Sequence, residues 1–133
     1  ILQVSAPFHC ALMQPAQDAL AADLATLTFA DPAFPVAANV TAQLVTSAST
    51  ARETLVAQVT GTVRWVECIQ LLAAPPAPIP SPTHFIELGP GRVLSGLNRQ
   101  ILGKPAPTPT LNVEDTASLE KTLAALTTPP QTS

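Results

Sequence analysis

Apolar residues recur at helical spacing in the first part of this chain. Every fourth residue from Leu12 to Leu24 is apolar, which predicts an amphipathic helix. Pro15 is compatible only with a first helical turn, so the helix should begin between residues 11 and 13. The side chains expected on its buried side are Leu12, Met13, Ala16, Leu20, Leu24 and Leu27.

The rest of the chain alternates short apolar runs with further helical patterns. Strands are predicted at residues 36–40, 83–88 and 111–113, and residues 1–4 form a short strand or lead-in. Helices are predicted after a capping box at Thr50–Glu53, from about Val63 with Trp65 as a core anchor, from Val93, and from Asp115 or Thr116. Residues 41–49 are expected to be a loop. This alternation indicates an α/β protein with a mainly parallel sheet.

Proline marks the boundaries of the expected domain. Residues 74–82 contain five prolines and predict an extended surface insertion, and residues 127–133 predict a flexible tail. One domain is therefore expected over residues 1–126. The first residue is Ile1 rather than Met, and it opens directly in an apolar segment, so we expect a piece of a longer protein.

Composition narrows the functional classes. The chain has 133 residues, 47% of them hydrophobic, and a net charge of −3 without a basic run, which argues against a nucleic-acid partner. No apolar run is long enough for a membrane span and no signal-peptide pattern is present, so a cytoplasmic protein is expected. Cys10 and Cys68 have no metal-ligand spacing and are expected to be free thiols.

His9 is the first candidate for chemistry, because it lies in a short segment before a predicted helix and neutral imidazole exchanges protons near neutral pH. The surrounding stretch V-S-A-P-F-H-C-A-L-M resembles the active-site histidine segment of bacterial malonyl-CoA:acyl carrier protein transacylases. Three further stretches resemble the same family in the same order. They are residues 28–40, residues 55–65 with L-V-A-Q-V and V-R-W, and residues 84–97 with H-F-I-E-L-G-P-G-R-V-L-S-G-L.

The resemblance covers residues 2–126 and only the C-terminal part of that family. It implies part of the large subdomain of an acyltransferase, which is α/β-hydrolase-like, without the ferredoxin-like small subdomain. It also implies malonyl transfer from malonyl-CoA to the phosphopantetheine thiol of acyl carrier protein in fatty acid synthesis, through a malonyl-serine ester. His9 then matches the general base, and the main-chain carbonyl of Gln58 matches the group that orients it.

The chain departs from the family in lacking the nucleophile. No G-x-S-x-G elbow occurs, and Ser5, Ser47, Ser49 and Ser95 lack its strand–turn–helix context. The family's carboxylate-binding arginine also belongs to the missing N-terminal part. We therefore expect this chain alone to be inactive and to need three partners: that N-terminal part, malonyl-CoA and acyl carrier protein. No cofactor and no metal are expected.

Other polar residues have structural interpretations. Asn39 is expected to hydrogen-bond neighbouring backbone, and His84 has no partner in the sequence. Gly89-Pro90-Gly91 between a strand and a helix predicts a tight turn more than an anion site, because it has no P-loop lysine. Arg64, Arg92 and Arg99 are expected on helix surfaces, with Arg92 a candidate for carrier-protein contact.

Two alternatives remain open at this point. The chain is also interpretable as a fragment of an acyltransferase domain from a polyketide synthase, although the short tail after Leu126 favours a stand-alone enzyme. It is also interpretable as a non-catalytic fragment that binds a carrier protein through the same fold.

Overall fold

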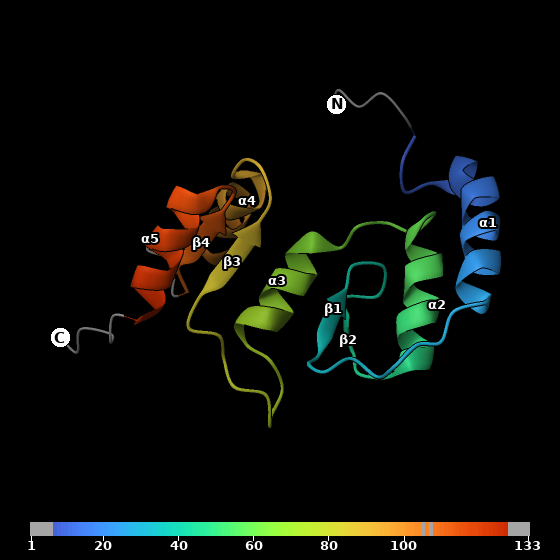
Figure 1. The fold of residues 1–133 in the computed structure, drawn as a ribbon, viewed down its shortest axis with the longest axis horizontal. Helices are drawn as coiled ribbons and strands as arrows, with labels where there is room; N and C mark the ends of the chain where they lie inside the picture. Colours follow the sequence, from blue (N-terminus) through green and yellow to red (C-terminus); the bar gives the residue numbers. More distant parts are fainter. Residues whose placement is uncertain (1–6, 105, 107, 128–133) are drawn as a thin grey trace. The chain divides into compact units, whose positions relative to one another are not determined.

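The computed structural model of the protein describes residues 7–104, 106 and 108–127, and the chain divides into two compact units (Figure 1). The first unit ends at Leu71 and the second begins at Leu72. The predicted lead-in strand at residues 1–4 and almost all of the predicted tail lie outside the described residues.

Strands and helices alternate in the second unit, whereas in the first unit a pair of strands lies between helices along the chain. The first unit contains the 3₁₀ helix η1 (Ala11–Met13), α1 (Gln14–Ala25), β1 (Val36–Ala38), β2 (Gln43–Val45), α2 (Ala48–Gln58) and most of α3 (Trp65–Ala73). The second unit contains β3 (Phe85–Leu88), α4 (Val93–Leu102), β4 (Thr110–Val113) and α5 (Thr116–Thr127). None of the helices in the described part of the chain has the length and apolar character that a membrane crossing requires.

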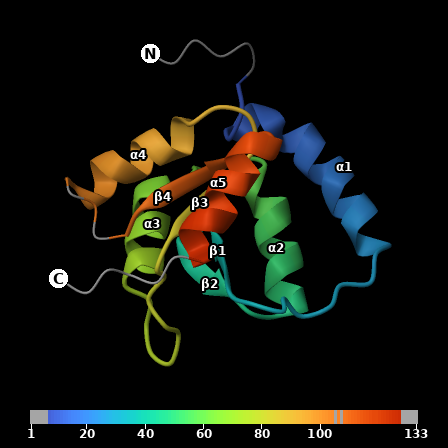
Figure 2. The same ribbon diagram turned by 60° about the vertical axis from the view of Figure 1, so that its left-hand side comes forward.

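The predicted α/β class is confirmed, and its parallel strands lie in the second unit. β3 pairs with β4 in parallel from Phe85↔Thr110 to Leu88↔Val113, and α4 is the crossover between them. Both α4 and α5 pack against β4 (Figure 2). Residues 74–82, between α3 and β3, contain neither helix nor strand.

The first unit is built around two helices that lie side by side, α1 and α2 (Figure 1). Pro15 occupies the first turn of α1, as predicted. Arg52 of α2 joins the two helices, because it donates from Nη2 to the Leu27 carbonyl at 2.9 Å and lies 4.9 Å above the Phe29 ring. The end of α1 is thereby attached to the middle of α2.

The prediction of a loop over residues 41–49 is wrong, because β2 lies within it. β1 and β2 form an antiparallel hairpin with Val36 opposite Val45. The connecting turn places Ala42 at a φ of 53°, a left-handed conformation that glycine or asparagine adopts more readily. Since the residue in this position is alanine, the sequence carries no signal for the turn.

Helix α2 begins one turn earlier than the capping box predicted. Its N-cap is Ser47, whose hydroxyl accepts from the Thr50 amide at 3.3 Å. The Asp31 carboxylate accepts from the Ala48 amide at 2.7 Å and satisfies a second free donor of the first turn. Asp31 lies 17 residues before Ala48 in the sequence, so a local sequence pattern could not predict this hydrogen bond.

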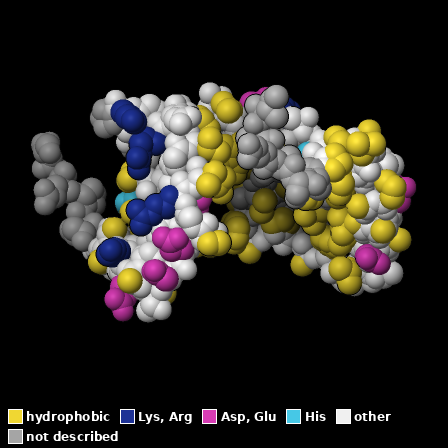
Figure 3. All heavy atoms as spheres, turned by 90° about the horizontal axis from the view of Figure 1, so that it is seen from above, with side chains coloured by type: hydrophobic (Ala, Val, Ile, Leu, Met, Phe, Trp, Pro, Cys, Tyr) yellow, Lys and Arg dark blue, Asp and Glu magenta, His cyan; other side chains and the backbone are white. Residues whose placement is uncertain are grey.

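The apolar stripes of several helices are exposed rather than buried. No residue of α1 is buried, Leu12 is 75% exposed and Leu55 of α2 is 51% exposed. Hydrophobic side chains are accordingly visible over the right-hand part of Figure 3. In α5 the buried residues are Ser118 and Thr122, whereas Leu119, Leu123 and Leu126 are exposed. For the first helix, the expectation of buried side chains is wrong at Leu12, Ala16 and Leu27, which are exposed, whereas Met13, Leu20 and Leu24 are half-buried. Each helix here has few neighbours to pack against.

The best-buried apolar residues belong to the first unit. Ile69 and Cys68 of α3 are each 2% exposed, and Val45 of β2 is 3% exposed. Trp65, which was predicted as the core anchor, is only half-buried. The core of this unit therefore lies where α3 meets the hairpin, with the Cys68 thiol 3.7 Å from the Ala38 carbonyl.

Gly61 should not tolerate a side chain. A Cβ placed there would lie 2.4 Å from the Val40 Cγ2 atom and 2.8 Å from the Ala57 carbonyl oxygen. We expect Gly61→Ala to lower the free energy of unfolding by about 1–3 kcal/mol in urea titrations. Gly96→Ala is the matched control, because no neighbouring atom lies within 4 Å of a Cβ placed at Gly96. Alanine is also more favourable than glycine in a helix interior by about 1 kcal/mol. Equal stability of the two variants would contradict this packing.

Candidate active site

His9 lies in the short segment that leads into η1, and its backbone is unusual. Its φ is 56°, in the left-handed region that non-glycine residues enter rarely. The next residue, Cys10, is extended, and its thiol donates to the Pro7 carbonyl at 3.1 Å. Such backbone strain costs about 1–3 kcal/mol and persists where the surroundings maintain it, often at functional sites.

The imidazole of His9 is held by the end of α2. Its Nδ1 atom lies 2.9 Å from the main-chain oxygen of Gln58, the last residue of that helix. A carbonyl in the last turn has no partner within its own helix and is free to accept this bond. Because a carbonyl oxygen only accepts, Nδ1 carries the proton and Nε2 keeps its lone pair. The structure thus brings together the two residues that the sequence nominated.

The turn after α2 fixes the position of that carbonyl. The Gln58 side chain donates from Nε2 to the Gly61 carbonyl at 3.1 Å, and the Gly61 amide donates to the Ala57 carbonyl at 3.0 Å. A side chain at Gly61 would also collide with Val40, so the turn is closely packed on that side. The acceptor of the His9 proton therefore belongs to a rigid turn rather than to a mobile side chain.

A cavity of about 340 Å³ adjoins Gln58 within the first unit. Its lining is mainly apolar and consists of Pro32, Val36, Ala37, Ala38, Asn39, Val45, Ala51, Thr54, Leu55 and Gln58. The carboxamide oxygen of Asn39 is buried here without a hydrogen bond within the described residues. The prediction that this side chain bonds neighbouring backbone is therefore wrong for its oxygen, and only the main-chain carbonyl of Asn39 accepts, from the Arg64 amide at 3.0 Å.

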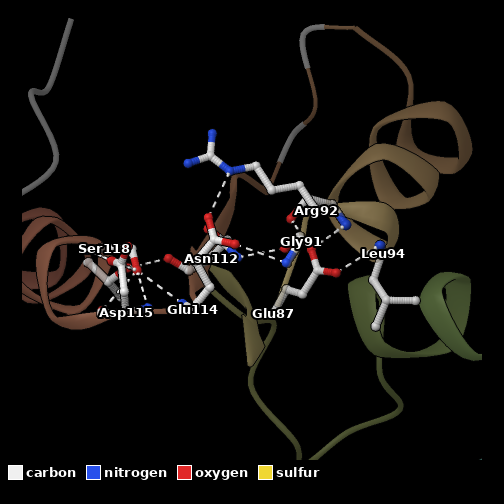
Figure 4. Close-up of polar contacts among 10 residues, drawn as sticks. Glu87, Gly91, Arg92, Leu94, Asn112, Glu114, Asp115 and Ser118 are labelled. Atoms are coloured by element: carbon white, nitrogen blue, oxygen red, sulfur yellow. Dashed lines mark hydrogen bonds and ion pairs between the residues drawn. The ribbon is translucent and has the colours of Figure 1, made fainter. Parts of the chain in front are cut away.

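In the second unit, a glutamate that sequence reasoning did not single out occupies the start of α4 (Figure 4). The Glu87 carboxylate accepts from the amides of Leu94 at 2.9 Å and Ser95 at 2.8 Å, and from the Ser95 hydroxyl at 2.5 Å. These contacts, the Ser95 hydroxyl first among them, lower the pKa of Glu87. The free amides that make a helix N-terminus attractive to anions are here satisfied by the protein itself.

The glycine turn before α4 is fastened to the end of β4. The Gly91 amide donates to the Glu114 carboxylate at 2.9 Å, and the Asn112 side chain donates to the Gly91 carbonyl at 2.8 Å. Arg92 lies 4.0 Å from the other Glu114 oxygen, and its side chain is 71% exposed. The expectation of a tight structural turn at Gly89–Gly91 fits these contacts.

Basic side chains gather in the second unit, which the sequence did not indicate. Two cavities of about 300 and 210 Å³ share Ser95, Arg99 and Thr110 in their linings. Four of the protein's six Lys and Arg residues line them, namely Arg92, Arg99, Lys104 and Lys121. Figure 3 shows these dark-blue side chains together at the left. We call this the basic groove.

The remaining candidate nucleophiles and ligands have structural partners. Ser47 caps α2, Ser95 donates to Glu87, and Ser5 lies outside the described residues. Burial raises the pKa of the Cys68 thiol, which makes it a poor nucleophile. Within the described part of the chain, the hydrogen bond of His84 is to the adjacent Thr83 hydroxyl, at 3.2 Å. Within residues 7–104, 106 and 108–127, no group of three or more potential ligands is arranged for a metal ion.

The chain resembles known proteins over about three quarters of its length. No protein-family model matches it. The malonyl CoA-acyl carrier protein transacylase of Salmonella typhimurium is 43% identical over 101 residues, which are 76% of this chain and 31% of the relative. The malonyl CoA-acyl carrier protein transacylase of Bacillus subtilis is 40% identical over 100 residues, which are 75% of this chain and 30% of that relative. The chain therefore spans about a third of the length of these curated relatives.

Solved structures show the same likeness. An acyl-carrier-protein S-malonyltransferase from Burkholderia pseudomallei matches with a TM-score of 0.79 and 39% identity, over 92% of this chain and 38% of that one. A malonyl-transacylase in complex with a type II polyketide synthase acyl carrier protein matches with a TM-score of 0.80 and 40% identity. The match covers 93% of this chain and 38% of that one. The resemblance predicted from the sequence is confirmed.

Glu87 makes stability depend on pH in a defined direction. Its folded pKa lies below the ordinary value of 4.5, so its contribution is full above that pH and is lost as the pH falls through the folded pKa. We expect Glu87→Gln to lower the melting temperature at pH 7, and the gap from wild type to shrink towards pH 3. Glu120→Gln is the control, because the described residues give that exposed side chain no hydrogen bond or ion pair. A gap that stays constant with pH would refute this role.

Proposed function

Because the chain is homologous to about a third of malonyl CoA-acyl carrier protein transacylases, we propose that it is the C-terminal part of such an enzyme. The reaction is transfer of a malonyl group from malonyl-CoA to the phosphopantetheine thiol of acyl carrier protein. The observation that carries the proposal is the 2.9 Å contact between His9 Nδ1 and the Gln58 carbonyl, which leaves Nε2 available as a base.

His9 acts twice in this reaction. Its Nε2 accepts the proton of a serine hydroxyl, supplied by the rest of the enzyme, as the serine oxygen attacks the malonyl thioester carbon. The C–S bond breaks, the CoA sulfur takes the proton from the imidazolium, and a malonyl-serine ester remains. In the second half, Nε2 accepts the proton of the carrier-protein thiol as its sulfur attacks the ester. That proton then returns to the serine oxygen.

The end of α2 supports the charged intermediate state of His9. A helix C-terminus carries a partial negative charge of about half an elementary charge, which favours a cation beside it by about 0.3–1 kcal/mol. In the described residues no carboxylate contacts the ring, so the Gln58 carbonyl and this helix end take the place of the acid of a catalytic triad. Gln58 is accordingly proposed as a positioning residue that acts through its main chain.

The rest of the enzyme is the first partner that we propose. The matched residues are only 31% and 30% of the two relatives, and we propose that the remainder supplies the nucleophile that this chain lacks. The exposed apolar side chains of η1, α2, α4 and α5 are suited to pack against that missing part. We therefore expect the chain to be inactive alone. No metal or cofactor enters this mechanism.

The basic groove is proposed as the surface that receives the phosphate-bearing substrates. Both malonyl-CoA and the carrier protein present a phosphopantetheine arm, and unpaired cations in a concave surface attract such anions. Arg99 and Lys104 have no ion pair in the part of the chain that the structure describes. One similar structure contains a polyketide synthase carrier protein, so a polyketide carrier is a second candidate acceptor.

Replacement of His9 tests the base directly. We expect His9→Ala in the complete enzyme to lower the rate of malonyl transfer by about 10²–10⁴-fold, the usual contribution of a general base. The measurement is transfer of labelled malonyl to acyl carrier protein. His84→Ala is the matched control and should leave the rate unchanged, since His84 has only a local contact. Near-normal transfer by the His9 variant would disprove the assignment.

The isolated chain provides the complementary control. After incubation with malonyl-CoA, intact mass spectrometry should show no added malonyl mass, because the chain holds the base without the nucleophile. A stoichiometric, hydroxylamine-labile adduct would instead mean that a nucleophile lies within these residues. Cys10, next to His9, would then be the first residue to replace.

Charge reversal tests the basic groove. We expect Arg99→Glu to raise the KM for acyl carrier protein by roughly 10-fold, with a smaller change for malonyl-CoA, because a macromolecular partner meets more of the groove. Gln100→Glu is the control, since it places the same negative charge on an adjacent exposed residue of α4 outside both cavities. A higher KM for malonyl-CoA alone would assign the groove to binding of CoA. Equal KM values in Arg99→Glu and Gln100→Glu would exclude the groove from substrate binding.

A further inference from the structure

We propose that Thr60 and Gln17 are positioning residues for His9. The inference rests on the function proposed above and concerns the same site. The hydroxyl of Thr60 donates to the side-chain oxygen of Gln17 at 2.5 Å, and both residues are half-buried. The two residues are 43 positions apart in the sequence, and neither matches a catalytic motif.

This hydrogen bond joins the same two segments of the chain as the bond between His9 and Gln58. Gln17 follows His9 by eight residues, and Thr60 follows Gln58 by two. The same two segments, the start of the first helix and the turn after α2, are thus joined at two points. One point is His9 Nδ1 to the Gln58 carbonyl, and the other is Thr60 to Gln17.

Two points of attachment constrain more than one. The contact of Arg52 with the Leu27 carbonyl restrains only the far end of α1. At its near end, the bond between His9 and Gln58 alone would still allow the first turns to pivot about that bond, and the ring would turn with its backbone. The second bond, about two helical turns further along, removes the pivot. Residues 11–17 between them are continuous 3₁₀ and α-helix, which transmits the constraint as a stiff element.

The His9 segment has few other restraints against this motion. Phe8, His9, Ala11 and Leu12 are all exposed, and the Cys10 thiol bonds only to nearby Pro7. The left-handed φ of 56° at His9 must nevertheless be maintained, and the local hydrogen bonds in the described part of this segment are those from the Cys10 thiol to Pro7 and from the Met13 amide to the Cys10 carbonyl. The clamp between Gln17 and Thr60 therefore controls whether Nε2 points consistently at the serine hydroxyl.

Removal of the Thr60 hydroxyl tests the clamp. In the complete enzyme we expect Thr60→Val to lower kcat by roughly 10-fold while the KM for malonyl-CoA stays within about twofold. That loss is smaller than the ~10²-fold that a 1 Å misplacement can cost, because the bond from His9 to Gln58 remains. Thr60→Ser keeps the hydroxyl and should restore kcat. Thr62→Val is the matched control, because this exposed hydroxyl makes no hydrogen bond in the described residues.

A double-mutant comparison separates the clamp from general destabilisation. Gln17→Leu should reproduce the loss seen in Thr60→Val, and the double variant should lose no more than either single variant. Losses that multiply would overturn the proposal. So would a kcat for Thr60→Val equal to that of Thr62→Val, or a loss of kcat that follows the melting temperature across all variants.

A spectroscopic readout distinguishes this inference from the proposed function. Two-bond proton–nitrogen NMR of the imidazole reports which ring nitrogen of His9 carries the proton. Wild type should show the proton on Nδ1, and Thr60→Val should show a mixture of tautomers. If His9→Ala retains activity, the proposed function is rejected, while the tautomer of His9 in Thr60→Val still tests the positioning role of Thr60 and Gln17. If His9 is essential and the tautomer does not change in Thr60→Val, only the clamp fails.

Discussion

The free carbonyl at the end of α2 is the constraint on which the candidate site depends. A helix leaves its last carbonyls without partners, and here one of them accepts the His9 proton at 2.9 Å. The helix must therefore end at Gln58, neither earlier nor later. Ser47 and Asp31 determine where α2 begins, and Gly61, which has no room for a side chain, determines how the chain leaves it. Backbone geometry in this way replaces a carboxylate side chain.

The two units use helix ends in opposite ways. At the C-terminus of α2 a free carbonyl organises a reactive imidazole and leaves Nε2 available. At the N-terminus of α4 the free amides are consumed by Glu87, whose carboxylate binds Leu94 and Ser95. A strand, a glycine turn and a helix therefore form a closed structural joint here rather than an anion site. The basic groove, proposed above to receive anions, includes Arg92 and Ser95 from this helix end in its lining, and it offers basic side chains rather than free amides.

The sequence predicted the elements better than their environments. Helical spacing, Pro15 and the glycine turn located α1 and α4, and the resemblance nominated His9 and Gln58, which the structure places in contact. Contacts between distant residues were not predictable from local patterns. These include the bond from the Ala48 amide to Asp31 that extends α2 and the left-handed Ala42 that closes a hairpin without glycine. They also include the bond that Glu87 accepts from the amide of Ser95, eight residues later. The pairing of Thr60 with Gln17 has no sequence signal of any kind, since it depends on how two helices lie.

The exposed apolar surface links completion of the fold to the chemistry. In the described residues sixteen large hydrophobic side chains are well exposed, with Leu88 at 77% and Leu12 at 75%. Burial of each such side chain contributes about 1.5–3 kcal/mol, so a chain that leaves them in water forgoes much of the stabilisation available to its relatives. Leu12 belongs to η1, two residues after Cys10 and three after His9. In a complete enzyme of the kind proposed above, a part that covered Leu12 would add apolar packing three residues from His9.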